Sequence, residues 1–154
     1  MAHIELTTTI NAPVETCFNL SRSIDLHTQS MHDTGEQAVA GTTSGLIGLN
    51  ETVTWRAKHF GLVMKMTSKI TELIFATSFT DEQVQGPFKR LKHRHIFEHI
   101  GQNRTLMTDE FEFESPMGFI GRLTDKLWMR AYMTELLAKR NEVIKQAAEM
   151  SAIA

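Results

Sequence analysis

Two neighbouring segments, residues 88–100 and 105–115, sort their side chains into a charged face and a mainly apolar face. Successive residues of a β-strand point to opposite sides of a sheet, so this pattern predicts the two arms of a hairpin. A turn at residues 101–103 sets three opposite-charge pairs across the arms: Arg94 with Glu110, Lys92 with Glu112 and Arg90 with Glu114. Because a slip of one residue would move every side chain to the wrong face, these pairs predict a single register.

Over residues 91–97 and 107–113, the second face of the hairpin is apolar except for His93, His95 and Asp109. The same register sets His95 opposite Asp109, among Phe97, Met107, Phe111 and Phe113. Polar groups held on an apolar face need partners, since an unpaired buried polar group costs about 1–3 kcal/mol. The sequence therefore predicts an internal site in this part of the sheet.

The chain before the hairpin alternates between strand and helix signals. Asn11 and Pro13 supply an N-cap and an early-turn proline for a short helix. Trp55 is expected opposite Met66, and a tight turn at residues 85–87 would set Phe79 opposite His93 with Asp81 on the inner side. The predicted elements are a strand over 3–10, helices over 14–21 and 25–30, and strands over 36–40, 51–59, 62–70 and 78–84.

A long helix is expected after the hairpin. Ser115 is a good N-cap and Pro116 suits the first helical position, so the helix is predicted to run from there to about Met150. A helix of about 30 residues spans roughly 45 Å and can cross a small sheet. Its predicted apolar stripe comprises Ile120, Leu123, Leu127, Ala131, Leu136, Leu137, Val143, Ile144 and Ala147. No linker divides residues 1–154, so a single domain is expected.

The composition limits the partners. The chain has 154 residues, 42% of them hydrophobic and 22% charged, with a net charge of −2, so no nucleic-acid partner is expected. No run approaches the roughly 18 apolar residues of a membrane span, so no membrane insertion is expected. With Cys17 as the single cysteine and no export signal, we expect a cytoplasmic protein without disulfides. His27 and His32, near the short helices, are expected on the surface without a function, and a position at the mouth of an internal cavity is the alternative.

Several local strings resemble an uncharacterised bacterial branch of the START and pollen-allergen superfamily, also called SRPBCC. These strings are ETVTWRAKHFG (51–61), FTDEQVQGPF (79–88), HRH (93–95) with Phe97, LMTD (106–109) and SPMG (115–118). The resemblance implies an α+β helix-grip fold, in which a curved antiparallel sheet of about seven strands wraps around a long C-terminal helix. Two short helices would follow the first strand. Such proteins enclose a cavity for a hydrophobic or amphipathic small molecule or lipid.

The first functional hypothesis is therefore binding of such a molecule between the sheet and the C-terminal helix. Small-molecule pockets combine apolar walls with a few polar groups, and the inner faces of the predicted strands supply both. The predicted ligand-binding residues are Trp55, His59, Met64, Met66, Phe79, Asp81, His93, His95, Phe97, Asp109, Phe111, Leu127 and Tyr132. A simpler alternative is that His95 and Asp109 only satisfy each other's hydrogen bonds within the sheet.

A second hypothesis is a cofactor-free cyclase or dehydratase, because some similar proteins are named cyclase/dehydrase. His95 oriented by Asp109 would be the general acid or base, since imidazole titrates near neutrality. His93 or Tyr132 would then polarise a substrate carbonyl. A third hypothesis is a protein-interaction module, because other similar proteins are named cell-division inhibitors. An exposed apolar patch on the short helices would favour it.

Metal binding is weighed on the same residues. His93 and His95, two apart on one strand, can point at one cation, and Asp109 or His59 would be the third ligand. No His-Glu-x-x-His or Cys-x-x-Cys string accompanies them, so neither a metal nor a cofactor is predicted. The oligomeric state, monomer or homodimer, is left open.

Overall fold

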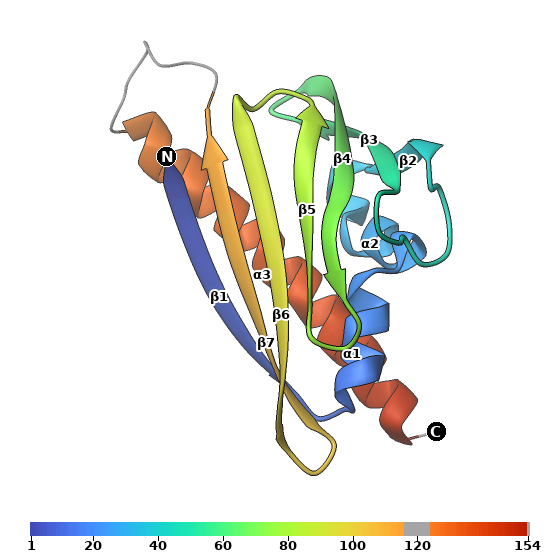
Figure 1. Ribbon diagram of the computed structural model, residues 1–154. Coiled ribbons are helices and arrows are strands. Elements are labelled where there is room, and N and C mark those ends of the chain that lie inside the picture. The colour runs from blue at the N-terminus through green and yellow to red at the C-terminus, as the bar shows by residue number, and fades with distance from the viewer. Residues whose placement is uncertain (116–123, 154) are drawn as a thin grey trace.

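Seven strands form one antiparallel sheet in the order β1-β7-β6-β5-β4-β3-β2, and a long helix crosses its concave face (Figure 1). The computed structural model describes residues 1–115 and 124–153. The strands are β1 (Ala2–Ile10), β2 (Gln37–Gly41), β3 (Thr52–His59), β4 (Leu62–Ile74), β5 (Ser78–Gln85), β6 (Arg90–Gly101) and β7 (Arg104–Glu114). The helices are α1 (Val14–Ser21), α2 (Ile24–Ser30), a 3₁₀ turn η1 (His32–Thr34) and α3 (Thr124–Ile153). The predicted helix-grip architecture is confirmed.

The predicted register of the β6–β7 hairpin is confirmed. Arg94 pairs with Glu110, Lys92 with Glu112 and Arg90 with Glu114, and His95 lies opposite Asp109. Arg94 Nη1 is 3.5 Å from Glu110 Oε2, while Glu114 takes Lys89 as its ion-pair partner at 2.8 Å. Trp55 also lies opposite Met66, as predicted. Cross-strand charge pairing thus identified the face of β6 and β7 that lies outside the core.

The charged face should show a small, measurable coupling. We expect Lys92→Glu to destabilise the protein by less than about 1 kcal/mol, because exposed cross-strand pairs contribute little. Adding Glu112→Lys restores an opposite-charge pair and should recover part of the loss. Urea unfolding of both single variants and the double variant measures the coupling free energy between the two side chains. Additive effects with no coupling would show that the two side chains do not interact.

The register between β5 and β6 differs from the prediction. Phe79 lies opposite His95, and Asp81 opposite His93, two residues away from the tight-turn register. The connection is longer because the Gln83 side chain bridges it: Nε2 donates to Phe88 O at 2.7 Å and Oε1 accepts from Phe88 N at 3.2 Å. A shift of two preserves the face, so Asp81 still lies on the inner side.

The start of α1 also differs from the prediction. Asn11 is not its N-cap: Pro13 occupies that position in an extended conformation, without a side-chain capping bond. The backbone N–H of Asn11 instead donates to Glu149 Oε1 on α3 at 3.0 Å. The link from β1 to α1 is thereby attached to the far end of the long helix.

The inward face of α3 differs from the predicted stripe. Leu137 and Ile144 are buried as predicted, whereas Leu127 is 62% exposed, Ala131 is also exposed, and the buried alanine is Ala148. Met129 and Met133 continue this face toward the start of the helix, where they pack against the apolar residues of β1, β6 and β7. Leu127 is two positions from Met129, about 200° around the helix, so it cannot share that face. Ser115 is described and is not helical, whereas Pro116, Ile120 and Leu123 lie outside the described residues.

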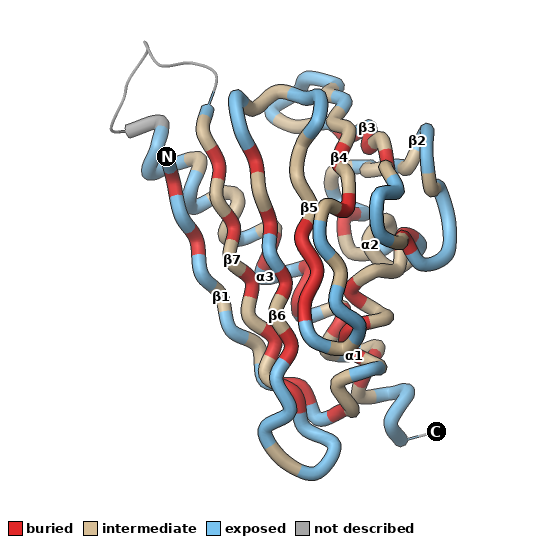
Figure 2. Tube along the Cα trace, in the orientation of Figure 1, coloured by how far each residue is buried: buried red, intermediate tan, exposed pale blue. Residues whose placement is uncertain are grey.

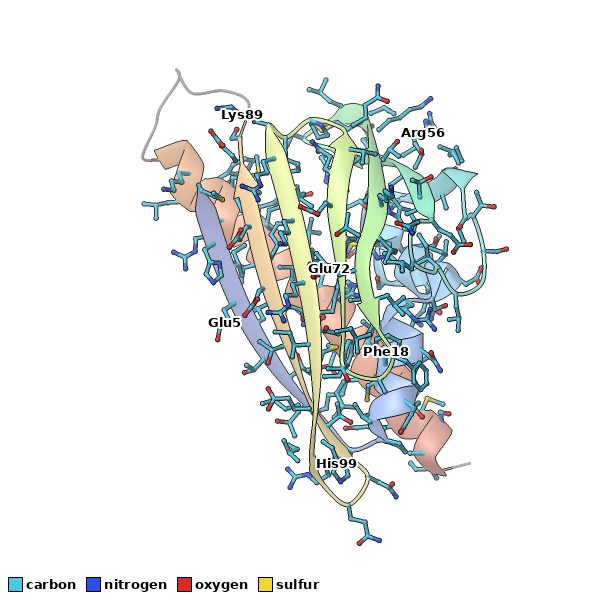
Figure 3. All side chains as sticks on the ribbon, in the orientation of Figure 1. Glu5, Phe18, Arg56, Glu72, Lys89 and His99 are labelled. Atoms are coloured by element: carbon cyan, nitrogen blue, oxygen red, sulfur yellow. The ribbon has the colours of Figure 1, made fainter. Side chains whose placement is uncertain are left out.

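Apolar packing fills one end of the space between sheet and helices. Phe18 of α1 (Figure 3) is fully buried there. Its ring contacts those of Phe79 and Phe97 edge to face, with ring centres 5.7 and 5.4 Å away. Buried positions follow the inner face of the strands and recur along α3 (Figure 2). Cys17 is buried in the same cluster, and burial raises the pKa of its thiol. Within the described residues, no helix combines the length and apolarity that a membrane span requires.

Candidate functional site

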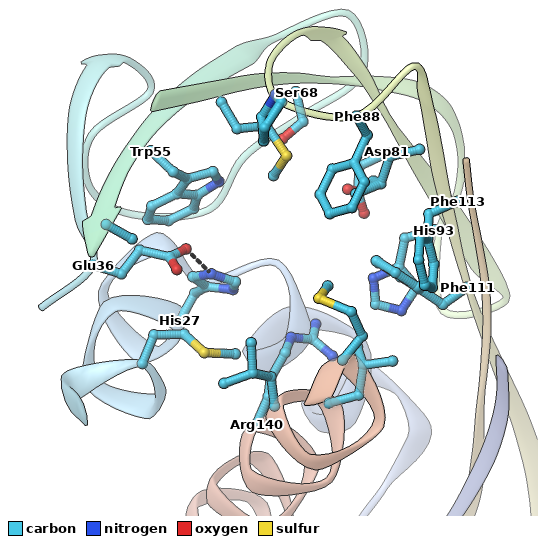
Figure 4. Close-up of a pocket in the computed structure, with 18 of the residues that line it drawn as sticks. His27, Glu36, Trp55, Ser68, Asp81, Phe88, His93, Phe111, Phe113 and Arg140 are labelled. Atoms are coloured by element: carbon cyan, nitrogen blue, oxygen red, sulfur yellow. Dashed lines mark hydrogen bonds and ion pairs between the residues drawn. The ribbon is translucent and has the colours of Figure 1, made fainter. Parts of the chain in front are cut away.

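A cavity of about 850 Å³ occupies the other end of this space. Its walls are the inner faces of β3 to β7, the helix α2 and the first half of α3 (Figure 4). Trp55, Met66 and Phe79 project from the sheet, and Met133 and Leu137 close the opposite side from α3. The volume lies within the range of cavities that bind small organic ligands, about 300–1,000 Å³.

The structure brings most of the predicted binding residues to this cavity. Those that line it are Trp55, His59, Met64, Met66, Phe79, Asp81, His93, His95, Phe111 and Tyr132. Three others lie elsewhere among the described residues. Phe97 belongs to the packed core around Phe18, Leu127 is exposed on the outer side of α3, and Asp109 is fully buried behind the histidines.

The inner histidines form a connected cluster with two carboxylates. A hydrogen bond of 2.8 Å joins His93 Nε2 to Asp109 Oδ1, and one of 3.0 Å joins His95 Nε2 to Asp81 Oδ2. His95 Nδ1 lies 3.1 Å from Asp109 Oδ1, but the two atoms are not oriented for a hydrogen bond. The sequence predicted a His95–Asp109 pair. The two residues do lie opposite each other, yet the hydrogen bond of His95 goes to Asp81 and Asp109 takes His93.

Two polar residues of α3, Arg140 and Asn141, complete the cluster, and Arg140 also lines the cavity. Asn141 Nδ2 donates to Asp109 Oδ2 at 2.6 Å, and Arg140 Nη1 lies 3.6 Å from Asp109 Oδ1. Arg140 is 4% exposed and Asn141 2%. Arg140 Nη2 also donates to the carbonyl of Ser21 at 3.2 Å, which ties α1 to the same network. Sequence reasoning missed both residues, although their spacing between Leu137 and Ile144 places them on the buried face of the helix.

Burial and charge set the protonation of the cluster. Burial, with a contribution from neighbouring His95, lowers the pKa of His93 to about 4 despite the Asp109 carboxylate. Burial would raise the pKa of Asp81, but the hydrogen bond from His95 and the nearby positive charges hold it below its ordinary value. Burial acts the same way on Asp109, and the two histidines hold its pKa well below the ordinary value. At neutral pH the cluster therefore presents two carboxylates and a neutral His93.

A second polar pair lies across the cavity. His27 Nε2 is 2.7 Å from Glu36 Oε1, and the His27 ring packs on Trp55 with the ring centres 4.3 Å apart (Figure 4). Both His27 and Glu36 line the cavity. His27 contributes to the cavity wall, which agrees with the alternative considered for it and not with a purely surface position, whereas the His32 side chain is 92% exposed.

One side of the cavity is closed by a contact between the β3–β4 turn and α3. His59 Nδ1 lies 2.7 Å from the hydroxyl of Tyr132. Phe60 packs against Trp128 and Tyr132, with ring centres 4.6 and 4.8 Å away. Phe60 and Gly61 both have positive φ, 54° and 76°, as a two-residue hairpin turn requires. The turn and the helix thus meet through aromatic rings and one hydrogen bond.

Solved structures share this architecture over nearly the full chain. The protein TTHA0849 from Thermus thermophilus is 18% identical with a TM-score of 0.73, over 96% of this chain and 99% of its own. The Zhui aromatase/cyclase from Streptomyces sp. R1128 is 15% identical with a TM-score of 0.73, over 96% and 93%. A START superfamily protein from Mycobacterium smegmatis is 14% identical with a TM-score of 0.73, over 96% and 97%. At these identities the likeness establishes the fold.

A comparison with curated proteins gives no significant match. The model of one protein family, described as polyketide cyclase / dehydrase and lipid transport, matches residues 10–128. The matched span includes the inner histidines, both carboxylates and the cavity wall formed by the strands β3 to β7. The chain therefore belongs to the polyketide cyclase / dehydrase and lipid transport family.

Proposed function

We propose that the protein binds an amphipathic small molecule or lipid in the cavity between the sheet and α3. The observation that carries this proposal is the cavity itself, which has a volume of about 850 Å³ and mostly apolar walls. Burying apolar surface supplies the affinity, at roughly 25 cal/mol per Å². The family's description, which includes lipid transport, agrees with this assignment.

The placement of the polar groups further describes the ligand. One polar end carries Asp81, His93 and His95, and the other carries His27 and Glu36. Trp55 packs on His27 at one end, and Phe79 stacks on His95 at the other. The ligand that fits is an extended or polycyclic molecule with an apolar body and a hydrogen-bonding group toward each end, because buried polar groups that remain unpaired would weaken binding.

A cavity-filling substitution tests the proposal. Ala57 is 7% exposed and lines the cavity from β3, so Ala57→Phe places a ring in the binding space. We expect the affinity for the neutral probe N-phenyl-1-naphthylamine, measured by fluorescence titration, to fall at least tenfold, or about 1.4 kcal/mol. The matched control is Ala40→Phe on the edge strand β2, where the residue is exposed. Equal affinity in wild type and Ala57→Phe would contradict binding in this cavity.

Acid–base catalysis is the second candidate. The observation that favours it is the Asp81–His95 hydrogen bond beside a cavity that His93 also lines as a neutral imidazole. A carboxylate–imidazole pair facing a bound carbonyl compound is suited to removing an adjacent proton. Proton exchange next to the carbonyl of 2-tetralone in D₂O, followed by NMR, tests this chemistry. Exchange no faster than in buffer would leave binding as the function.

The protein-interaction hypothesis gains no support from the short helices. The feature that would favour it is an exposed apolar patch on α1 and α2. In the described part of the chain, Phe18 and Ile24 are buried, and none of the large exposed hydrophobic side chains belongs to either helix.

A further inference from the structure

Three side chains at the polar end of the cavity have the composition of a transition-metal site. Asp81, His93 and His95 each place a ligand-type atom, a carboxylate oxygen or an imidazole nitrogen, within 4.8 Å of the other two. We propose that these residues bind one divalent first-row transition-metal ion such as Zn²⁺ or Co²⁺. The proposal concerns the metal alone and does not depend on what fills the rest of the cavity.

The spacing of the donor atoms suits one ion. Three atoms that all lie within 4.8 Å of one another share a point no more than about 2.8 Å from each, which is 4.8 Å divided by √3. Metal bonds to imidazole nitrogen and carboxylate oxygen are about 2.0–2.2 Å, so only a small inward movement is needed. His95 Nε2 and Asp81 Oδ2 are already 3.0 Å apart. Two donors at about 2.1 Å from one ion, at right angles, have that separation.

The surroundings orient the histidines as metal ligands are oriented. A metal-bound histidine usually directs its second ring nitrogen to a carboxylate, which fixes the tautomer. Asp109 is placed for this role toward His93, whose Nε2 is hydrogen-bonded to its Oδ1 at 2.8 Å, while His95 Nδ1 lies 3.1 Å from the same oxygen without an aligned hydrogen bond. Asn141 in turn holds the other oxygen of Asp109. The sequence considered Asp109 as a possible third ligand. The structure places it behind the histidines and brings Asp81 forward instead.

Charge balance also accommodates a cation. Asp81 and Asp109 both approach the histidines, and the Arg140 guanidinium, 3.6 Å from Asp109, offsets one of the two carboxylates. A bound cation offsets the other. Two imidazoles with one carboxylate favour first-row transition metals over Mg²⁺, which prefers oxygen ligands. Because Asp81, His93 and His95 all line the cavity, the remaining coordination positions face its interior.

A cobalt titration of the intact protein tests the site. After chelator treatment and its removal, Co²⁺ should produce a visible ligand-field absorption that saturates at one ion per chain. Zn²⁺ should displace it, because Zn²⁺ binds such sites more tightly, and millimolar Mg²⁺ should not. Absence of this absorption, or saturation only at several ions per chain, would overturn the proposal.

Matched variants locate the ion. Asp81→Asn keeps an amide that can hydrogen-bond His95 but removes the anionic donor, and His93→Gln removes one imidazole. Each should weaken Co²⁺ binding at least tenfold, and Asp109→Asn should weaken it by about 10–100-fold through the histidines. His99→Gln is the control, because His99 is exposed near the tip of the same hairpin (Figure 3).

Circular dichroism establishes that each variant is folded before it is titrated. If Asp81→Asn does not fold, Asp81→Glu replaces it, since the longer side chain moves the carboxylate away from the donor triangle and should also weaken binding at least tenfold. Unchanged Co²⁺ affinity in a folded variant at position 81 and in His93→Gln would place the ion elsewhere and overturn the proposal.

Discussion

Replacing Asp109 with leucine is expected to lower the free energy of unfolding by about 3–5 kcal/mol, the range for breaking a buried ion pair on one side. Asp109 is fully buried and accepts hydrogen bonds from His93 and Asn141. Removing its carboxylate leaves those donors without their partner and leaves the Arg140 guanidinium, 3.6 Å away, without its nearest counter-charge. Unpaired buried donors add about 1–3 kcal/mol each in the worst case.

Urea unfolding followed by circular dichroism measures the loss. Asp109→Asn should be milder, because an amide still accepts one of the hydrogen bonds. The matched control is Glu110→Leu on the neighbouring, solvent-facing position of β7, whose partner Arg94 lies 3.5 Å away with 46% of its side chain exposed. That change should stay within about 1 kcal/mol. A loss below about 1 kcal/mol for Asp109→Leu would mean that Arg140 finds another partner without cost.

Lowering the pH from 7 to 4 is expected to remove about 3 kcal/mol of stability through His93 alone. Its pKa is about 4 in the folded protein, against an ordinary value of 6.5. Between these two pKa values His93 is protonated in the unfolded chain and neutral in the folded chain, so a lower pH favours unfolding. Each unit of difference corresponds to about 1.4 kcal/mol. The contribution of neutral His93 to the free energy of unfolding is fully present above pH 6.5 and is lost as the pH falls toward 4.

The test is a series of urea unfolding curves between pH 7 and pH 4. His93→Gln should flatten the dependence in this interval, while His99→Gln, on an exposed position of the same strand, should retain it. Asp81 and Asp109, whose pKa values lie below the ordinary range, add destabilisation of the same sign at still lower pH. Stability that stays constant from pH 7 to pH 4 in the wild-type protein would contradict a neutral, buried His93.

The β6–β7 hairpin shows how much of the site could be predicted from sequence. Opposite charges at Arg94 and Glu110 identify the outer face, and alternation then places His93, His95 and Asp109 inside. The hydrogen-bond partners within the site could not be obtained this way. These partners depend on the register of β5 against β6, which the Gln83–Phe88 loop shifts by two residues. They also depend on which residues of α3 lie over the histidines.

The helix shows a different limit. The aliphatic pattern of α3 predicts Leu127 and Ala131 on the inward face and does not single out Arg140 or Asn141. The structure buries the polar pair because Asp109, on a strand far away in sequence, supplies the matching acceptor. Hydrophobic periodicity alone does not identify a buried polar residue whose partner lies in another element. Helical spacing does place Arg140 and Asn141 on the same face as Leu137 and Ile144, and this position can indicate that the two polar residues are buried.

The long helix is supported unevenly along its length. Beyond Arg140, Ile144 and Ala148 pack into the core around Phe18, whereas Met129, Met133 and Leu136 face the cavity. A molecule that fills the cavity would complete the packing of the first half only. Occupancy would then be registered as slower amide hydrogen exchange from Met129 to Leu137, with little change after Ile144. Amide exchange in the first half of α3 would then indicate whether the cavity is occupied, while the packing of the second half keeps the protein folded in both states.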